Sequence, residues 1–199
     1  MSGARARVVV IGSNSFSGAS FVAHSLSSGM DVLGMSRSEE PSDVFLPYRW
    51  KSSGADLQCF RFEKLDINND TDRISDSIRV FRPEYVVNFA AQSMVAQSWE
   101  HPEDWYQTNV VGNIKLHDRI RRFDFIKKYV HISTPEVYGN CAGKVTESAC
   151  FNPSTPYAAS RAACDLHLRT FFNRYKFPVV FTRAANVYGP GQQLYRIIP

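Results

Sequence analysis

Long apolar runs are missing from this sequence of 199 residues. A helix that crosses a bilayer needs roughly 18 or more consecutive apolar residues, so we expect no membrane partner. An excess of one charge is also missing, because 23 Lys and Arg face 19 Asp and Glu. The basic residues are dispersed except for Arg119, Arg121, Arg122, Lys127 and Lys128. We interpret this cluster as a solvated helix end, and we expect no nucleic-acid partner.

Metal-binding and redox patterns of cysteine are absent as well. The cysteines at 59, 141, 150 and 164 form no C-x-x-C pair, and the five histidines form no H-E-x-x-H motif. We therefore expect free thiols and no metal site. The short apolar run Val8–Ile11 is followed by glycine rather than by a signal-peptide cleavage site. The default expectation is a globular protein of the cytoplasm.

An alternation of short apolar runs with segments of helical spacing recurs along the chain. This alternation is typical of a parallel sheet with crossover helices, so it predicts an α/β protein with a doubly wound sheet. The six expected strands are Arg7–Ile11, Val32–Met35, Gln58–Phe62, Tyr85–Phe89, Lys128–Ile132 and Val179–Thr182.

The segments between these strands contain the expected helices. Apolar residues repeat at helical spacing over 19–26 and 74–81, and Asp70 precedes the second of these segments as a predicted amino-terminal cap. Longer helices are predicted over Trp105–Phe123 and Thr155–Tyr175. Ser36–Gly54, which contains two prolines, is predicted to be a surface loop.

Two turns at the ends of expected strands suit a dinucleotide. The turn after the first strand reads Gly12-Ser-Asn-Ser-Phe-Ser-Gly18, where a pyrophosphate meets a helix amino terminus in this fold class. The usual middle glycine is replaced by Ser15, so an ordinary strand-to-helix turn is the alternative. After the third strand, Asp66 and Ile67 are expected to hold the adenine edge, unless Asp66 only caps a turn. The glycine turn predicts cofactor contacts from Gly12, Ser15, Phe16, Ser17 and Gly18.

The end of the second expected strand lacks the carboxylate that would bind the adenosine ribose. Ser36 and Arg37 stand there instead, and a serine and an arginine can receive a ribose 2′-phosphate, which would favour NADP over NAD. The alternatives are an exposed loop arginine and a fold-back of Glu39 or Glu40 toward this position.

Chemically versatile side chains gather after the fifth expected strand. Ser133, Thr134 and Glu136 lie at its carboxyl end, where chemistry collects in doubly wound sheets. Tyr157 and Arg161 are four residues apart on an expected helix and point the same way. A cation one turn away can lower the pKa of a phenol, which would make Tyr157 a general base. A surface tyrosine–arginine pair is the alternative.

These motifs together resemble the extended short-chain dehydrogenase/reductases, and within them the nucleotide-sugar 4,6-dehydratases. The resemblance spans essentially the whole chain. The Ser-Thr-x-Glu-x-Tyr-Gly string points to dehydratases, since related epimerases and reductases generally lack its glutamate. Besides the glycine turn, the motifs that carry the resemblance are Asn88–Val95, Thr108–Gly112, Ser133–Gly139, Ser154–Tyr157 and Thr182–Pro190.

The resemblance implies a Rossmann domain that binds NAD or NADP and a nucleotide-sugar substrate. Tyr157 would take the proton of the C4 hydroxyl, Thr134 would hydrogen-bond the same oxygen, and Glu136 would remove the C5 proton as the C6 hydroxyl leaves. Hydride would pass from C4 to C6 through the cofactor and give a 4-keto-6-deoxy sugar nucleotide. The residues implied at the cofactor are Ala90, Ala91, Gln92, Asn109, Ser133, Tyr157 and Arg161, and those implied at the substrate are Ser93, Thr134 and Asn186.

Two positions depart from the family pattern. Pro135 replaces the aspartate that protonates the leaving hydroxyl in glucose-type dehydratases, although GDP-mannose-type dehydratases lack that aspartate too. Arg161 replaces the family's lysine, which retains the charge but places the donors differently. A dTDP-glucose-like substrate is expected, because Tyr188–Gln193 resembles those enzymes more. An epimerase or reductase, and a dinucleotide-binding protein with little turnover, are the alternatives.

The resemblance also implies how the chain is organised. Residues 1–185 would form the dinucleotide-binding domain, and residues 186–199 would begin a substrate-binding portion that is largely missing, as in a truncated two-part enzyme. Family members usually dimerise through the helices expected at 105–123 and 155–175. A homodimer is therefore expected, and Leu166, Leu168, Phe171 and Phe172 supply apolar surface for it.

Overall fold

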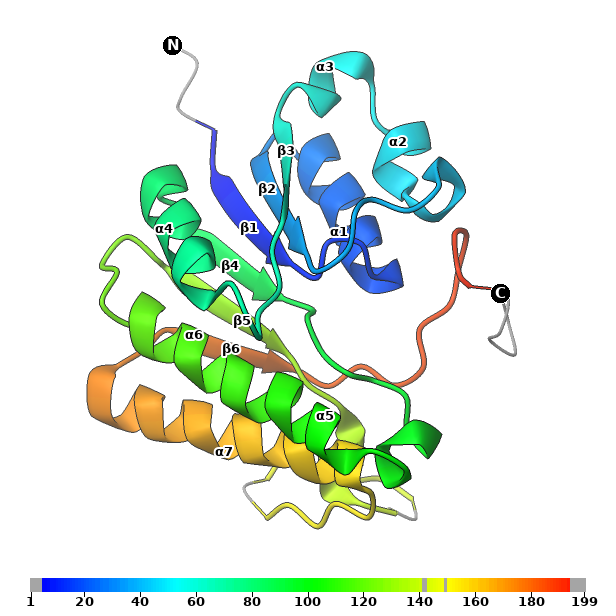
Figure 1. Ribbon diagram of the computed structural model, residues 1–199, viewed down its shortest axis with the longest axis vertical. Coiled ribbons are helices and arrows are strands. Elements are labelled where there is room, and N and C mark those ends of the chain that lie inside the picture. Colours follow the sequence, from blue (N-terminus) through cyan, green and yellow to red (C-terminus); the bar gives the residue numbers. More distant parts are fainter. Residues whose placement is uncertain (1–4, 141–142, 149, 194–199) are drawn as a thin grey trace.

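The computed structural model describes residues 5–140, 143–148 and 150–193. Its centre is a sheet of six parallel strands in the order β3-β2-β1-β4-β5-β6 (Figure 1). This architecture confirms the predicted doubly wound sheet, although the third strand begins two residues later than predicted. The strands are β1 (Arg7–Ile11), β2 (Asp31–Ser36), β3 (Phe60–Lys64), β4 (Tyr85–Asn88), β5 (Lys128–Ile132) and β6 (Val179–Thr182).

Helices cover the sheet in two layers (Figure 1). One layer contains α1 (Phe16–Ser27), α2 (Pro47–Lys51) and α3 (Gly54–Leu57), and the other contains α4 (Thr71–Phe81), α5 (Pro102–Tyr106), α6 (Asn113–Ile120) and α7 (Pro156–Tyr175). Within the described residues, no helix has the length and apolar character that a membrane span requires.

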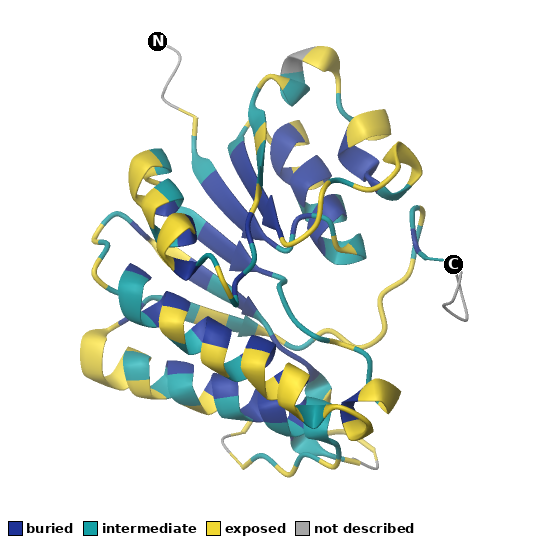
Figure 2. Ribbon diagram, in the orientation of Figure 1, coloured by how far each residue is buried: buried dark blue, intermediate teal, exposed yellow. Residues whose placement is uncertain are grey.

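The two layers enclose two hydrophobic cores, one on each face of the sheet. Successive side chains of a strand point to opposite faces. Val8 and Val10 of β1 therefore pack with α1, whereas Val9 and Ile11 pack with α4, α6 and α7. Figure 2 shows the buried strands between helices whose outer surfaces are exposed. The central strands are thus buried on both faces, and the segments that follow them leave the sheet at its carboxyl edge.

The predicted surface loop at 36–54 is partly a packed segment. It contains a 3-10 turn at Asp43–Phe45 and helix α2, and Leu46 and Tyr48 are fully buried in the core beside α1. The Tyr48 ring lies 4.7 Å from that of Phe60. The loop prediction was wrong here because Pro47 begins a helix, a position that proline tolerates.

The helix predicted over Trp105–Phe123 is interrupted by a π-helical turn at Gln107–Gly112, between α5 and α6. The Asn113 side chain donates to the Thr108 carbonyl oxygen at 2.9 Å inside this turn. A π-turn inserts an extra residue into a helix and often marks a functional site. The predicted helix at Thr155–Tyr175 is confirmed as α7, with the Thr155 side chain as its amino-terminal cap.

Candidate functional site

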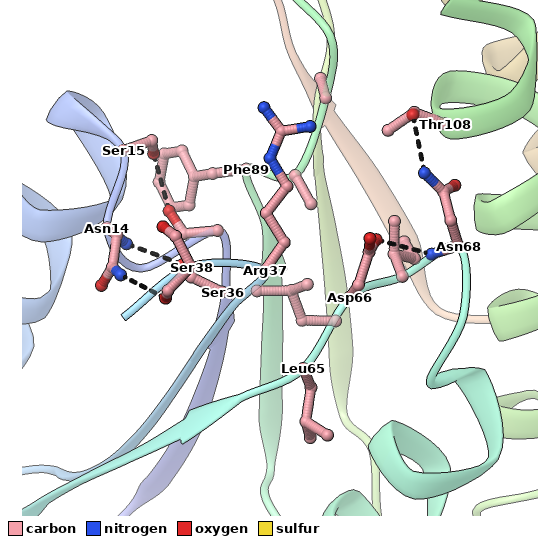
Figure 3. A pocket seen from close by; sticks show the side chains of 15 residues that line it. Asn14, Ser15, Ser36, Arg37, Ser38, Leu65, Asp66, Asn68, Phe89 and Thr108 are labelled. Carbon is pink, nitrogen blue, oxygen red and sulfur yellow. Dashed lines mark hydrogen bonds between the residues drawn. The ribbon is translucent and has the colours of Figure 1, made fainter. Parts of the chain in front are cut away.

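A cavity of about 250 Å³ opens at the carboxyl ends of β1 to β4 (Figure 3). Its walls come from the segments that follow each of these strands, together with Thr108 of the π-turn. The order of strands reverses between β1 and β4, and ligands bind at such a reversal point in open α/β sheets. Eight predicted cofactor contacts line this cavity: Gly12, Ser15, Ser36, Arg37, Asp66, Ile67, Ala90 and Ala91.

The two glycines of the turn after β1 are required by close backbone contacts. Gly12 has a φ of 83°, and a Cβ atom there would lie 2.8 Å from the Ala90 nitrogen. A Cβ atom on Gly18 would lie 2.2 Å from the Gly12 carbonyl oxygen. Glycine at these positions therefore lets β1, α1 and the end of β4 approach one another.

Ser15 takes the place of the usual middle glycine without strain. Its φ is −72°, and its hydroxyl accepts from the Gly18 N–H at 3.1 Å and donates to the Gly12 carbonyl at 2.7 Å. Ser15 thus caps α1. The N–H groups of Phe16 and Ser17, in the first turn of α1, have no acceptor within a helix and suit an anion. Phe16, Ser17 and Gly18 adjoin the cavity rather than line it.

Asn14 connects this turn to the end of β2. Its backbone N–H donates to the Ser36 hydroxyl at 2.9 Å, and its side-chain amide donates to the carbonyls of Ser38 and Glu39 at 3.0 and 2.9 Å. Sequence reasoning missed Asn14, although its place inside the glycine turn was a signal. Asn14 holds residues 36–39 against the phosphate turn.

Arg37 extends between the glycine turn and the segment after β3 (Figure 3). The two nearby glutamates are engaged elsewhere. Glu39 pairs with Lys64 at 3.2 Å, and Glu40 pairs with Arg49 at 2.7 Å and accepts from the Tyr48 hydroxyl. The alternative that Glu39 or Glu40 folds back was therefore wrong, whereas Arg37 is exposed, as the other alternative predicts.

The carboxylate of Asp66 shapes the turn after β3 while Asp66 and Ile67 line the cavity. Its oxygens accept from the Asn68 N–H at 2.9 Å and from the Asn69 side chain at 3.3 Å. Asp70 is the N-cap residue of α4, at the predicted position, but its side chain makes no capping hydrogen bond and instead accepts from the Asp66 N–H at 2.9 Å. The turn-capping interpretation of Asp66 is confirmed.

Asn109 clamps the segment after β4. Its amide accepts from the Gln92 N–H at 2.8 Å and donates to the Gln92 carbonyl at 3.0 Å and to the Ser160 hydroxyl at 2.9 Å. Asn109 is fully buried and does not line the cavity, nor does Gln92. Its observed contacts therefore join the π-turn, the segment after β4 and α7.

Three of the predicted catalytic residues lie around the end of β5 and the start of α7. Thr134 is buried, and its hydroxyl accepts from the Glu136 N–H at 3.3 Å in the 3-10 turn Pro135–Tyr138. Glu136 is exposed, and partial desolvation raises the pKa of its carboxyl. Tyr157 is half-buried in the first turn of α7, and its N–H donates to the Ser98 hydroxyl at 3.2 Å. None of the three lines the cavity.

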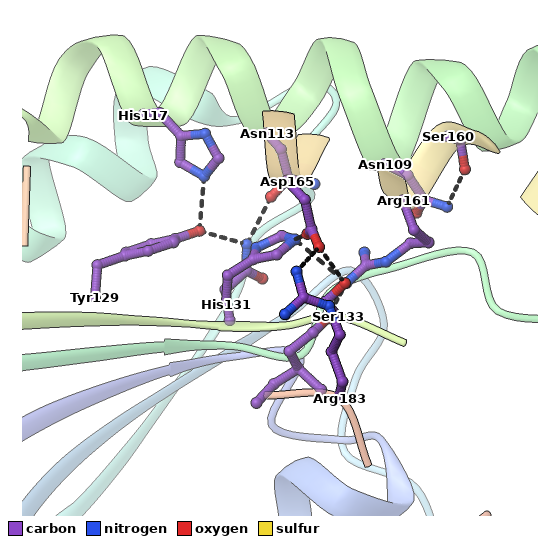
Figure 4. Close-up of polar contacts among 12 residues, drawn as sticks. Asn109, Asn113, His117, Tyr129, His131, Ser133, Ser160, Arg161, Asp165 and Arg183 are labelled. Carbon is purple, nitrogen blue, oxygen red and sulfur yellow. Dashed lines mark hydrogen bonds and ion pairs between the residues drawn. The ribbon is translucent and has the colours of Figure 1, made fainter. Parts of the chain in front are cut away.

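Arg161 is turned into the protein interior (Figure 4). Its guanidinium donates to the Ile132 carbonyl, and Nη2 lies 3.3 Å from His131 Nε2. Nη1 is buried with no hydrogen-bond partner among the described residues. The alternative of a surface tyrosine–arginine pair was therefore wrong, and the observed contacts of Arg161 are with the end of β5.

Asp165 joins the ends of β5 and β6 through its fully buried carboxylate (Figure 4). Oδ2 accepts from the Ser133 hydroxyl at 2.7 Å and from Arg183 at 2.8 Å, and Oδ1 lies 3.7 Å from His131 Nε2. Burial raises the pKa of Asp165, and Ser133 and Arg183 act in the opposite direction. Sequence reasoning missed Asp165, although it stands one helical turn after Arg161.

His117, His131 and Cys164 form a buried cluster whose donor atoms lie within 4.8 Å of one another. His117 Nε2 is hydrogen-bonded to the Tyr129 hydroxyl at 2.8 Å, and the Arg161 guanidinium beside His131 opposes a bound cation. Burial lowers the pKa of both histidines and raises the pKa of Cys164 to about 12. No disulfide joins the described cysteines at 59, 150 and 164, and Cys141 lies outside the described residues.

The predicted substrate contacts Ser93 and Asn186 are exposed, on the segments that follow β4 and β6. The structure thus places predicted site residues after each of the six strands. The family model for GDP-mannose 4,6 dehydratase matches residues 9–198. The chain belongs to this family.

Known members of the epimerase/dehydratase group resemble the chain in sequence. It is 32% identical over 203 residues to the dTDP-glucose 4,6-dehydratase of Xanthomonas campestris pv. campestris strain B100, with 96% of this chain and 56% of that protein covered. It is 38% identical over 117 residues to the human dTDP-D-glucose 4,6-dehydratase, with 58% of this chain and 33% of that protein covered. The predicted resemblance to nucleotide-sugar 4,6-dehydratases is confirmed.

Solved structures of dehydratases and epimerases share the fold. The Streptomyces venezuelae dTDP-glucose 4,6-dehydratase with NAD and TYD bound has a TM-score of 0.80 at 30% identity over 97% of this chain and 60% of that one. The Thermus thermophilus UDP-glucose 4-epimerase with NAD has a TM-score of 0.79 at 29% identity over 94% of this chain and 57% of that one. The chain therefore spans a little over half the length of such relatives, and the expectation of NAD or NADP agrees with these complexes.

Proposed function

We propose that this chain is the dinucleotide-binding part of a cytoplasmic nucleotide-sugar 4,6-dehydratase. The reaction would convert a dTDP-glucose-like substrate into a 4-keto-6-deoxy sugar nucleotide. The observation that carries the proposal is the 3-10 turn after β5, in which Thr134 and Glu136 are joined by a hydrogen bond, with Tyr157 at the start of α7. A dehydratase needs the glutamate, whereas related epimerases generally lack it.

The residues around the cavity fit NAD(P). Gly12 and Gly18 stand where any Cβ atom would collide with backbone, and the first turn of α1 offers free N–H groups to a pyrophosphate. The carboxyl ends of β2 and β3 supply Ser36, Arg37 and Asp66 for the adenosine end. A bound nicotinamide would supply reversible hydride acceptance next to the sugar.

Thr134 and Tyr157 would act on the C4 hydroxyl. Because the Thr134 hydroxyl oxygen accepts from the Glu136 N–H, its own hydrogen is left to donate to the sugar oxygen. Tyr157 would accept the proton of that hydroxyl as a general base.

Glu136 would carry the elimination. Its raised carboxyl pKa suits a group that takes the C5 proton and then gives a proton to the departing C6 hydroxyl. Both roles fall to Glu136 because its neighbour Pro135 has no proton to give. Arg161 would support the site indirectly, since it binds the Ile132 carbonyl directly before Ser133 and Thr134.

One observation favours the second candidate, a dinucleotide-binding protein with little turnover. The Arg161 guanidinium contacts the protein interior, whereas the family's lysine would serve the phenol and the cofactor. A weaker activation of Tyr157 would follow if this contact persisted with ligand bound.

The activity test uses purified protein that includes a substrate-binding portion, with dTDP-glucose or GDP-mannose and either dinucleotide. We expect dTDP-glucose to give the alkali-induced absorbance of a 4-keto sugar. Glu136→Gln should lower the rate roughly 100-fold or more and leave dinucleotide affinity unchanged, because acid–base groups contribute factors of this size. Glu103→Gln, in the exposed first turn of α5, is the matched control. Dinucleotide binding without product from either sugar would favour the second candidate.

We also propose that the protein forms a homodimer through α6 and α7. Leu166 and Phe172 of α7 are 47% and 50% exposed, which leaves apolar surface for a partner. Leu168 is buried in the core and Phe171 packs against it, so these two residues do not contribute as predicted. Sedimentation at micromolar concentration distinguishes a dimer from a monomer.

The division into residues 1–185 and 186–199 stays a proposal, and 194–199 lie outside the described residues.

A further inference from the structure

The geometry points to Arg183 as a positioning residue that holds the 3-10 turn carrying Thr134 and Glu136. Arg183 directly follows β6 and does not line the cavity. Its guanidinium is linked instead to residues at both ends of the turn. The inference rests on the proposed function, because it concerns catalysis only if Thr134 and Glu136 react with the sugar.

The pairing of β5 with β6 brings Arg183 to the start of the turn. Ile132 and Thr182, the last residues of these two strands, are in register, and the Ser133 N–H donates to the Thr182 carbonyl at 2.9 Å. Neighbouring strands lie about 4.8 Å apart, so the residues that follow them, Ser133 and Arg183, emerge side by side.

At the start of the turn, Arg183 acts through Asp165 (Figure 4). Arg183 Nη2 donates to Asp165 Oδ2 at 2.8 Å, and the same oxygen accepts from the Ser133 hydroxyl at 2.7 Å. A paired cation is what permits this carboxylate to be fully buried, so the acceptor of Ser133 depends on Arg183. Ser133 directly precedes Thr134.

At the end of the turn, Arg183 contacts aromatic rings. Its guanidinium carbon lies 5.4 Å from the centre of the Tyr138 ring, 5.5 Å from that of Phe151 and 5.3 Å from that of Phe181. A guanidinium within about 6 Å of a ring centre is attracted to the face of the ring. Tyr138 is the last residue of the turn, so this end too is held by the residue that follows β6.

The turn that carries Glu136 is short. It spans four residues, Pro135–Tyr138, and the Gly139 N–H donates to the Glu136 carbonyl at 2.9 Å. The Asn152 N–H donates to the Val137 carbonyl at 2.9 Å. Because 3-10 turns have poor hydrogen-bond geometry, side chains at the two ends contribute to keeping the turn in place. A change at either end would displace the carboxyl group.

Native-state hydrogen exchange of this chain tests the inference without requiring turnover. We expect Arg183→Gln to raise the exchange rates of the Gly139 and Asn152 N–H groups about 10-fold or more. The increase is measured relative to the N–H groups of β1, whose exchange reports opening of the whole fold. Dinucleotide affinity should change less than about two-fold, because Arg183 lies outside the cavity.

Arg121→Gln is the matched control. Arg121 pairs with Asp118 at 2.8 Å and lies 4.3 Å from the centre of the Tyr175 ring, so it too combines an ion pair with an aromatic contact. This variant should leave exchange at the turn unchanged. Arg183→Lys keeps the charge opposite Asp165 without the planar guanidinium and should give an intermediate increase, and it carries the test if Arg183→Gln does not fold.

Steady-state kinetics measure the effect on catalysis. In protein that includes a substrate-binding portion, Arg183→Gln should lower kcat about 10-fold or more, because displacement of a reacting group by about 1 Å can cost 100-fold. KM should change less than about three-fold, since the loss is in the chemical step. Arg183→Lys should recover part of kcat.

The outcomes separate this inference from the proposed function. Equal increases in exchange at the turn and in β1 would show that Arg183 only stabilises the whole fold, and would overturn the inference. Unchanged kcat in a variant whose turn exchanges faster would overturn it as well. If the unsubstituted protein with its substrate-binding portion gives no 4-keto sugar, the proposed function is wrong, and faster exchange at the turn would still confirm that Arg183 holds it.

Discussion

Asp165 shows how one side chain can hold separate strands together. It has no exposed surface, and it accepts hydrogen bonds from Ser133 after β5 and Arg183 after β6. An isolated buried carboxylate is strongly unfavourable, so these partners are what permit it. Removal of the carboxylate would leave Arg183 and the nearby Arg161 without their anion.

We expect Asp165→Ala to lower the free energy of unfolding by about 3–5 kcal/mol, as for other broken buried pairs. Asp165→Asn keeps the shape of the side chain and one oxygen acceptor, so it should lower the free energy of unfolding less. Urea unfolding measures both. Asp76→Ala, which removes a mostly exposed ion pair with Arg79, is the control and should have little effect. A loss no larger than that of the control would contradict the role of Asp165.

The polar residues that hold the site were harder to predict from sequence than those that line it. Gly12 and Arg37 could be placed at the cavity because each follows a recognisable apolar strand, and the family resemblance implied Ala90 there. Asn14 and Asp165 were missed although each is near a recognised residue, because the partners that explain their roles are far away in the sequence and only the folded chain brings them together.

At the scale of elements, the π-turn determines where the segment after β4 lies. Asn109 projects from this turn, and its three hydrogen bonds reach Gln92 and Ser160. The residues before Gln92, Ala90 and Ala91, line the cavity. The turn therefore acts on ligand binding through the position of a neighbouring segment.

We expect Asn109→Ala to weaken dinucleotide binding about 10-fold, because each buried group left unpaired is worth about 1–3 kcal/mol and the wall of the cavity loses its anchor. Titration with NADH or NADPH measures the affinity, and urea unfolding separately measures stability. Asn173→Ala, on the exposed surface of α7, is the matched control. Lost stability with unchanged affinity of the folded fraction would show that Asn109 serves the fold alone.

Strands were predicted better than helices for a physical reason. Buried parallel strands are continuous apolar runs, and β1, β5 and β6 begin and end at the predicted residues. The π-turn could not be predicted, because it depends on side-chain amides that bind distant backbone. Helix α2 was missed because its five residues are too few to show a period, and burial of Tyr48 stabilises it.

At the scale of the whole molecule, two buried histidines make folding sensitive to acid. Burial holds the pKa values of His117 and His131 well below the ordinary value of 6.5, and the charge of Arg161 adds to this for His131. Below pH 6.5 the unfolded chain binds protons that the folded chain cannot bind. The contribution of these histidines to the free energy of unfolding is therefore complete above pH 6.5 and is lost as the pH falls.

We expect stability to fall below pH 6.5 by roughly 1.4 kcal/mol per pH unit for each of these histidines. Because the pKa of Asp165 is raised, this residue makes the free energy of unfolding fall as the pH rises above 3.8. The dependence of the free energy of unfolding on pH is therefore best compared between variants. The two histidines together lower the free energy of unfolding as the pH falls. His117→Gln should remove about half of this decrease, measured by urea unfolding between pH 7.5 and 5.5. His24→Gln, at an exposed position of α1, should leave it intact. Identical slopes in all three proteins would contradict the assignment.

The cavity is bounded by segments after four different strands. Its flanking strands β1 and β4 are separated in the chain by the 73 residues between Ile11 and Tyr85. No part of the chain that ends before β4 contains a complete binding site. A dinucleotide bound in this cavity would therefore stabilise the assembled sheet relative to the unfolded chain. By mass action, occupancy at 100 times the dissociation constant would add about 2.7 kcal/mol to the free energy of unfolding. A supply of dinucleotide would thus raise the stability of the folded protein.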